Sequence, residues 1–131
     1  MDHNLLRAAK DVLNNAYVKY SNFHVAAALK MKNGVIITGV NVENASYGLS
    51  NCAERTALFT ARTQGYDKHD IVEVVVTTKQ KAIISPCGAC RQVMSELILP
   101  DVPIHLVSAE DEVKTLLNKE LLPLGFSEDD L

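Results

Sequence analysis

The sequence has little of what membrane-spanning and nucleic-acid-binding proteins require. No apolar run approaches the roughly 20 residues needed to span a membrane, and the opening stretch MDHNLLRAAKDVL carries interspersed charges, unlike a signal peptide. The 13 Lys and Arg residues are outnumbered by 16 Asp and Glu, so no basic excess is available to bind a nucleic-acid backbone. Aromatic residues make up only 5%, which leaves few side chains to stack on bases. We therefore expect neither a membrane nor a nucleic acid as a partner.

Cysteine is also scarce, with three residues in the chain. An odd number of cysteines without a secretion signal argues against a disulfide framework, so we expect a cytoplasmic protein. No repeat, low-complexity tract or linker divides the 131 residues, and this length suffices to bury a full core. We expect a single domain spanning residues 1–131.

Hydrophobic spacing predicts the first elements. Apolar residues between positions 5 and 17 share one helical stripe, which predicts an amphipathic helix. Apolar and polar residues alternate over 23–31, and Asn33-Gly34 supplies a hairpin turn before a second strand over about 35–42.

The rest of the chain predicts alternating strands and helices. Residues 71–76, IVEVVV, are apolar on both faces, as in strands covered by helices on both sides, and 104–108 is a similar, shorter candidate. Helices are predicted to start near Asn51 and Ser85, while residues 112–116 have no assignment. This order predicts an α/β fold in which a mixed sheet lies between helices.

The three cysteines lie in two short runs, NCAERTAL (51–58) and SPCGACRQ (85–92). Ser85 is the predicted N-cap of one helix with Pro86 at its first position, and Asn51 is the predicted N-cap of the other. Both runs therefore lie where helix dipoles and free N–H groups favour thiolate over thiol.

The cysteine pattern suits a metal. Cys87 and Cys90 are three apart and share one helix face, and Cys52 begins the other helix. Clustered thiolates would repel one another without a cation, and zinc accepts sulfur ligands tetrahedrally. Three protein ligands leave a fourth position for water, as in catalytic zinc sites.

Several simpler interpretations remain for the single residues. A cysteine is often just a buried small hydrophobe, and Cys87 and Cys90 could form a redox pair, although this leaves Cys52 unexplained. Glu54 could close a capping box with Asn51. The joint pattern of Cys-x-Glu and Pro-Cys-x-x-Cys favours the metal.

The histidines offer no alternative ligand. The sequence predicts that His3 and His69 are solvated and that His24 and His105 are surface or edge residues of strands. None has a partner at metal-ligand spacing.

The sequence closely resembles the small cytidine deaminases of nucleoside salvage. The likeness runs through four stretches that include both cysteine runs and the zinc-deaminase signature Cys-x-Glu with Pro-Cys-x-x-Cys. These stretches are AYVKYSNF (16–23), GVNVENASYGLSNCAERTAL (39–58), SPCGACRQVMSEL (85–97) and ELLPLGFSEDDL (120–131). Lys19 and Ala26 replace a proline and a glycine that the family often has, and neither touches the signature.

The resemblance implies a three-layer α/β/α sandwich and a homotetramer whose active sites are completed by neighbouring subunits. It implies hydrolytic deamination of cytidine and 2′-deoxycytidine to uridine and 2′-deoxyuridine in pyrimidine salvage, with one zinc ion per subunit. Cys52, Cys87 and Cys90 would hold the zinc. Glu54 would shuttle protons while zinc-bound hydroxide attacks C4 of the base.

The resemblance also implies the substrate contacts. These are Phe23 packed on the nucleoside, Asn41 and Glu43 on the ribose 3′-hydroxyl, the Ala53 N–H and the Ser85 carbonyl on the base, and Tyr47 and Phe126 near a neighbour's site. A deaminase of another aminopyrimidine nucleoside, such as blasticidin S, would share the zinc motif. A structural zinc module would need a fourth protein ligand, for which the sequence has no obvious candidate.

Arg55 completes the first cysteine run. Zinc at +2 with three thiolates leaves a site of net charge −1, which weakens the metal as a Lewis acid. Arg55 is near enough in sequence to hydrogen-bond the thiolates and offset this charge, and the alternative is an exposed helix arginine.

Overall fold

One mixed sheet organises the chain. The structure, a computed structural model, describes all residues 1–131. The strands are β1 (Val25–Met31), β2 (Ile36–Val40), β3 (Ile71–Thr78), β4 (Pro103–Val107) and β5 (Val113–Leu117). Their spatial order is β2-β1-β3-β4-β5, with β3 and β4 parallel and the other neighbours antiparallel.

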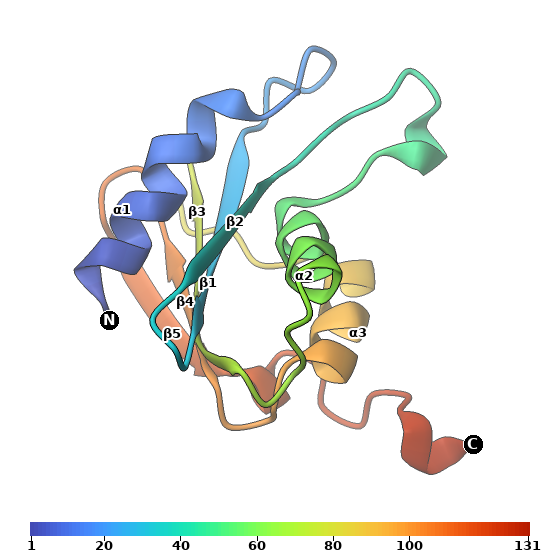
Figure 1. The fold of residues 1–131 in the computed structure, drawn as a ribbon. Coiled ribbons are helices and arrows are strands. Elements are labelled where there is room, and N and C mark those ends of the chain that lie inside the picture. Colours follow the sequence, from blue (N-terminus) through green and yellow to red (C-terminus); the bar gives the residue numbers. More distant parts are fainter.

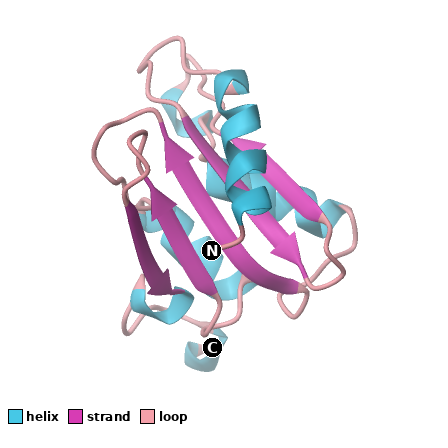
Figure 2. Cartoon of the chain, turned by 90° about the vertical axis from the view of Figure 1, so that its left-hand side faces the viewer, coloured by secondary structure: helices cyan, strands magenta, loops and turns pink.

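Three helices cover the two faces of the sheet. Helix α1 (His3–Val12) lies on one face, and α2 (Ala53–Thr63) and α3 (Gly88–Leu97) lie on the other (Figures 1 and 2). The predicted three-layer α/β/α sandwich is therefore confirmed. No helix is both long enough and apolar enough to cross a membrane.

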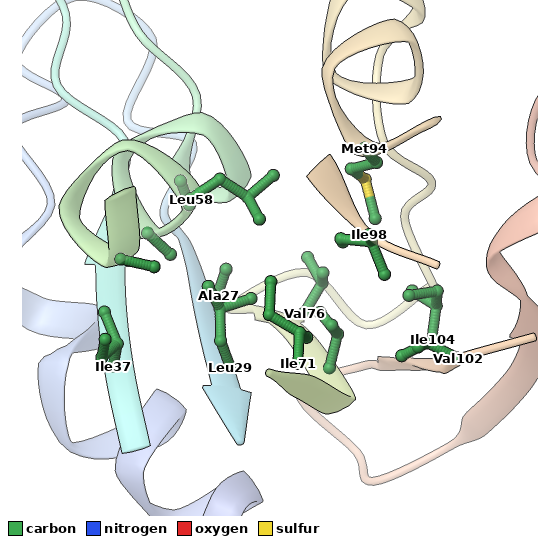
Figure 3. Packing of buried hydrophobic residues seen from close by; sticks show 14 of the residues in the cluster. Ala27, Leu29, Ile37, Leu58, Ile71, Val76, Met94, Ile98, Val102 and Ile104 are labelled. Carbon is green, nitrogen blue, oxygen red and sulfur yellow. The ribbon is translucent and has the colours of Figure 1, made fainter. Parts of the chain in front are cut away.

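The core is divided by the sheet into two parts. Val74 and Val76 point toward α2 and α3, while Val75 between them points toward α1, because successive strand side chains alternate. Figure 3 shows the larger part, where Leu58 of α2 and Met94 of α3 face the sheet. This confirms that β3 is apolar on both faces.

A glycine brings α2 directly against the sheet. A Cβ atom added to Gly39 of β2 would lie 2.4 Å from the Ala57 nitrogen and 2.7 Å from the Ala53 carbonyl oxygen. Ala53 is the first residue of α2, so the close approach at Gly39 helps to place the helix start that carries Cys52.

The four predicted strands are confirmed: β1 and β2 are shorter than predicted, β3 extends two residues further to Thr78, and β4 is shifted by one residue. Strand β1 begins at Val25, and β2 ends at Val40. The stretch without a predicted state forms the edge strand β5. Its residues are largely exposed, so the burial that normally creates an alternating pattern is missing.

Both predicted helix starts were wrong by one or two residues. Cys52, not Asn51, is the N-cap of α2, because backbone hydrogen bonds between Asn51 and Val42 hold Asn51 in extended conformation. Cys87, not Ser85, is the N-cap of α3. A proline at 86 disfavours helical backbone at the preceding residue. Glu54 is then the second helical residue, so it closes no capping box.

His105 was wrongly predicted to be a surface or edge residue. It is buried in β4, and both ring nitrogens have partners on neighbouring strands. Nε2 lies 2.7 Å from Oε2 of Glu73, and Nδ1 lies 2.7 Å from Oγ1 of Thr115. A buried imidazole is tolerated here because both nitrogens are satisfied.

Candidate active site

Two helix starts bring the three cysteines together. Cys52 caps α2, Cys87 caps α3, and Cys90 lies in the first turn of α3. Their Sγ atoms all lie within 4.8 Å of one another, and those of Cys52 and Cys87 are 3.7 Å apart. All three are free thiols.

The cluster fits zinc. Sulfur ligands about 2.3 Å from a tetrahedral zinc lie about 3.8 Å apart, close to the separation of Cys52 and Cys87. No His, Asp, Glu or further Cys joins the group, so one coordination position stays open for water or substrate. The third thiol also distinguishes the cluster from a two-cysteine redox pair.

The surroundings shift the pKa values of Cys52 and Cys90 in opposite directions. The pKa of Cys52 falls to about 5, chiefly because Cys90 donates a hydrogen bond to its sulfur and also because Arg55 does. The same Cys52–Cys90 bond, together with burial, raises the pKa of Cys90. The pKa shifts therefore favour the thiolate at Cys52 and the protonated thiol at Cys90.

Arg55, the third residue of α2, contacts the cluster. Its Nη2 lies 3.4 Å from Sγ of Cys52, and the Cys52 thiolate raises the pKa of the guanidinium. The side chain is half-buried, and its Nε is buried without a partner. The positive guanidinium group of Arg55 therefore lies beside Sγ of Cys52, the thiol whose pKa is lowered.

Glu54 is a buried carboxyl group beside the thiols. Its side chain is only 5% exposed. Burial, and in second place the Cys52 charge, raises the pKa of Glu54 to about 7. A carboxyl group with this pKa can both accept and donate a proton near neutral pH.

A small cavity joins these groups to several predicted substrate contacts. It measures about 160 Å³. Its lining residues are Phe23, Val25, Asn41, Cys52, Ala53, Glu54, Ile84, Ser85 and Cys87. Val25 and Ile84 were not predicted as site residues, because apolar residues in or beside strands carry no signal that separates a pocket wall from a core position.

Asn41 and Glu43 hold the loop that carries Phe23. The Asn41 side chain accepts a hydrogen bond from the Val25 N–H (3.0 Å) and donates one to the Phe23 carbonyl (2.7 Å). Glu43 accepts from the backbone N–H groups of Tyr20 and Ser21, at 3.1 Å each. A further hydrogen bond from the Ser21 hydroxyl is the main cause that lowers the pKa of Glu43. Asn41 lines the cavity and Glu43 does not.

Two predicted contacts lie outside the cavity. Tyr47 is 75% exposed on the arm between β2 and α2, which projects from the molecule in Figure 1. Phe126 is 59% exposed in the C-terminal segment, beside a separate groove against α2 and α3. Neither side chain reaches the cavity of its own chain.

Comparison with known proteins identifies the family. Residues 1–106 match the model of the cytidine and deoxycytidylate deaminase zinc-binding region. The chain belongs to this deaminase family. The family is defined by a zinc-binding region, and the three-thiol cluster fits that metal. The protein is therefore a zinc-dependent hydrolytic deaminase, and the resemblance predicted from its motifs is confirmed.

Relatives of this deaminase match over nearly the whole chain. A cytidine deaminase from Halalkalibacterium halodurans is 46% identical over 97% of this chain and 95% of its own. The crystal structure of cytidine deaminase from Burkholderia pseudomallei superposes with a TM-score of 0.92 at 46% identity, covering 96% of this chain and 99% of that one. A blasticidin-S deaminase from Bacillus cereus is more distant, at 29% identity over 96% of this chain and 92% of its own.

Proposed function

We propose that this protein deaminates cytidine and 2′-deoxycytidine to uridine and 2′-deoxyuridine, with release of ammonia, in cytoplasmic pyrimidine salvage. The observation that carries the proposal is one cavity lined by a buried carboxyl group, Glu54, and two of the three clustered thiols. The substrate is supported by 46% identity to a cytidine deaminase, against 29% to a blasticidin-S deaminase.

Cys52, Cys87 and Cys90 would hold one zinc ion per chain. When bound, zinc supplies a nucleophile at neutral pH by lowering the pKa of a water ligand to about 7. We assign Arg55 to the thiolates, where its charge opposes theirs and limits the loss of Lewis acidity.

Glu54 would carry the protons of the reaction. It takes a proton from the attacking water and delivers it to N3 of the base, which allows C4 to accept the oxygen. It then passes the second proton of that water to the amino group, and the C4–N bond breaks to release ammonia. One carboxyl group suffices because the transfers are sequential.

The remaining cavity residues would orient the nucleoside. The Ala53 N–H would hold the base carbonyl, and the Ser85 carbonyl would accept a hydrogen bond from the amino group. Phe23 would pack against the nucleoside. Asn41 has one amide hydrogen and one lone pair beyond those used on its own loop, and we assign it with Glu43 to the ribose 3′-hydroxyl.

We extend the proposal to a homotetramer with shared active sites. The cavity of about 160 Å³ is smaller than the roughly 300–1,000 Å³ of typical ligand pockets, so a single chain encloses too little of a nucleoside. Tyr47 and Phe126 are exposed aromatic residues that would complete a neighbour's site. Free nucleosides rather than nucleic acids are the proposed substrates.

The test is the ultraviolet absorbance of purified protein mixed with a panel of substrates, with zinc measured alongside. We expect cytidine and 2′-deoxycytidine to react, and free cytosine and 3′-deoxycytidine to be poorer by up to about 10⁴-fold, because a site built for a hydroxyl rejects analogues that lack it. Faster turnover of blasticidin S than of cytidine would reassign the substrate. Full zinc content without turnover of any member of the panel would favour a structural zinc module.

A further inference from the structure

The C-terminal segment, residues 121–131, is joined to the rest of the chain by very few hydrogen bonds. Three cross its boundary: the Leu121 N–H donates to the Asn118 carbonyl (3.1 Å) in the adjoining turn, and the adjacent side chains of Arg91 and Gln92 on α3 donate to carbonyl groups of the segment. The other hydrogen bonds of the segment are local turns and caps, such as Gly125 N–H to the Leu122 carbonyl (3.2 Å). The position of the segment therefore depends on α3, beside which it runs in Figure 1.

Arg91 binds the segment and the active-site loop at once. Its Nη1 donates to the Leu121 carbonyl at 2.7 Å, and its Nε donates to the Pro86 carbonyl at 2.8 Å. Its Nη2 donates to the Ser85 hydroxyl. Because the guanidinium is planar and rigid, these three bonds fix the loop before Cys87 relative to Leu121.

Gln92 holds the segment farther along. Its Nε2 donates to the Phe126 carbonyl at 2.8 Å. Beyond Leu121 the segment has little core of its own, since Leu124 is fully exposed and Phe126 is 59% exposed. An open groove of about 360 Å³ lies between Phe126 and the helices, so packing alone leaves the aromatic ring loosely placed.

We propose that Arg91 and Gln92 are positioning residues that couple the C-terminal segment to the zinc-binding helix. Arg91 aligns both the Ser85–Cys87 loop and the base of the segment, whereas Gln92 aligns only the part that carries Phe126. The functional consequence rests on the proposed function, in which Ser85 contacts the base and Phe126 completes a neighbouring site. The coupling itself rests on the hydrogen bonds alone.

The first variant is Gln92→Met, which keeps the length and helix propensity of the side chain and removes the donor. Gln80→Met is the matched control, because the Gln80 side chain is exposed and makes no hydrogen bond. We expect amide hydrogen exchange of residues 121–131 to become about 3- to 10-fold faster in Gln92→Met, the effect of losing one hydrogen bond. Zinc content and kcat should stay near the parent values while KM for cytidine rises several-fold.

The second variant is Arg91→Lys, which keeps the charge and loses the planar fork. Because Arg91 holds the loop as well as the segment, we expect faster exchange in both regions and faster zinc loss to a chelator. Gln92→Met should lose zinc at the parent rate. This difference separates the two roles and does not depend on activity.

Unchanged exchange of residues 121–131 in Gln92→Met, or an equal increase in Gln80→Met, would overturn the role of Gln92. Parent-like zinc retention in Arg91→Lys would overturn the coupling through Arg91. A parent protein that turns over no cytidine would refute the proposed function, while the exchange and chelator measurements would still decide the coupling.

Discussion

At the scale of single residues, the site contains ionisable side chains that are largely shielded from solvent. Glu54 is buried beside a thiolate, and Arg55 brings a positive charge to the same sulfur. Interactions between such groups are stronger than at the surface because the surrounding dielectric is low. Small chemical changes at these positions should therefore have large effects on activity and small effects on shape.

Glu54→Gln should retain zinc and lose at least about 100-fold in kcat, because an amide fills the same space but relays no protons. The measurement is the cytidine turnover rate with zinc analysis of the same samples. A rate within a few-fold of the parent would remove Glu54 from catalysis.

Arg55→Gln should lower kcat/KM by removing the charge that offsets the three thiolates. Adding Cys52→His to this variant should recover part of the loss, since a neutral ligand replaces a thiolate and restores the total charge. Both single variants and the double variant are compared, with zinc content checked in each. Strictly additive losses would contradict charge compensation.

At the scale of elements, one contact helps to place α2 against the sheet and another helps to place α1. The contact at Gly39 sets α2 against β2, and Asp2 caps α1 while pairing with Lys30 of β1 at 2.7 Å. Each contact joins elements that are separated in sequence. Their loss should appear first as lower stability.

Gly39→Ala should lower the free energy of unfolding by about 1–3 kcal/mol or more, because the added methyl group meets helix backbone that cannot give way. Gly48→Ala is the matched control, since a Cβ there meets nothing within 4 Å. Denaturant unfolding of both variants is the measurement. Equal stability of the two would show that α2 can move away from the sheet.

Asp2→Asn should lower the melting temperature at neutral pH. The Lys30 hydrogen bond is the largest cause that lowers the pKa of Asp2, so the ion pair contributes stability above the usual Asp pKa of about 3.9 and loses it as the pH falls through the lower folded value. The difference between parent and variant should therefore shrink in acid. A difference that is constant from neutral pH to the acid limb would contradict a stabilising role for the ionised Asp2 carboxylate.

At the scale of the whole molecule, the proposal of an active site shared between chains rests on two observations. The cavity is small, and two aromatic residues implied in substrate binding, Tyr47 and Phe126, are exposed and do not line it. Assembly of several chains would enlarge the small cavity and would bring the exposed aromatic residues of one chain to the site of another.

Removing residues 126–131 should abolish activity while leaving zinc bound, and the full-length protein should sediment as a tetramer. Phe126→Ala in the full chain is the narrower test, because it removes the ring and keeps the backbone bond to Gln92. Sedimentation and cytidine turnover are measured on the same samples. A fully active monomer would refute the shared site.

The sequence alone was sufficient for the family, the layered fold, four of the five strands and the identity of the three thiols and the nearby glutamate. These features are encoded locally: alternation within a strand, helical spacing within a stripe, and ligands that share a turn. The cysteine motifs also carried the chemistry, because few roles require Cys-x-Glu and Pro-Cys-x-x-Cys together.

Only the tertiary structure decided where the helices start and which distant groups meet. Asn51 is kept out of α2 by pairing with Val42, and His105 is buried because Glu73 and Thr115 lie on the adjacent strands. The bonds from Arg91 and Gln92 to the C-terminal segment join residues 30 and 34 positions apart. Such contacts depend on how the helices pack against the sheet. The spacing of residues along the chain does not encode this packing, so the contacts could not be predicted from the sequence.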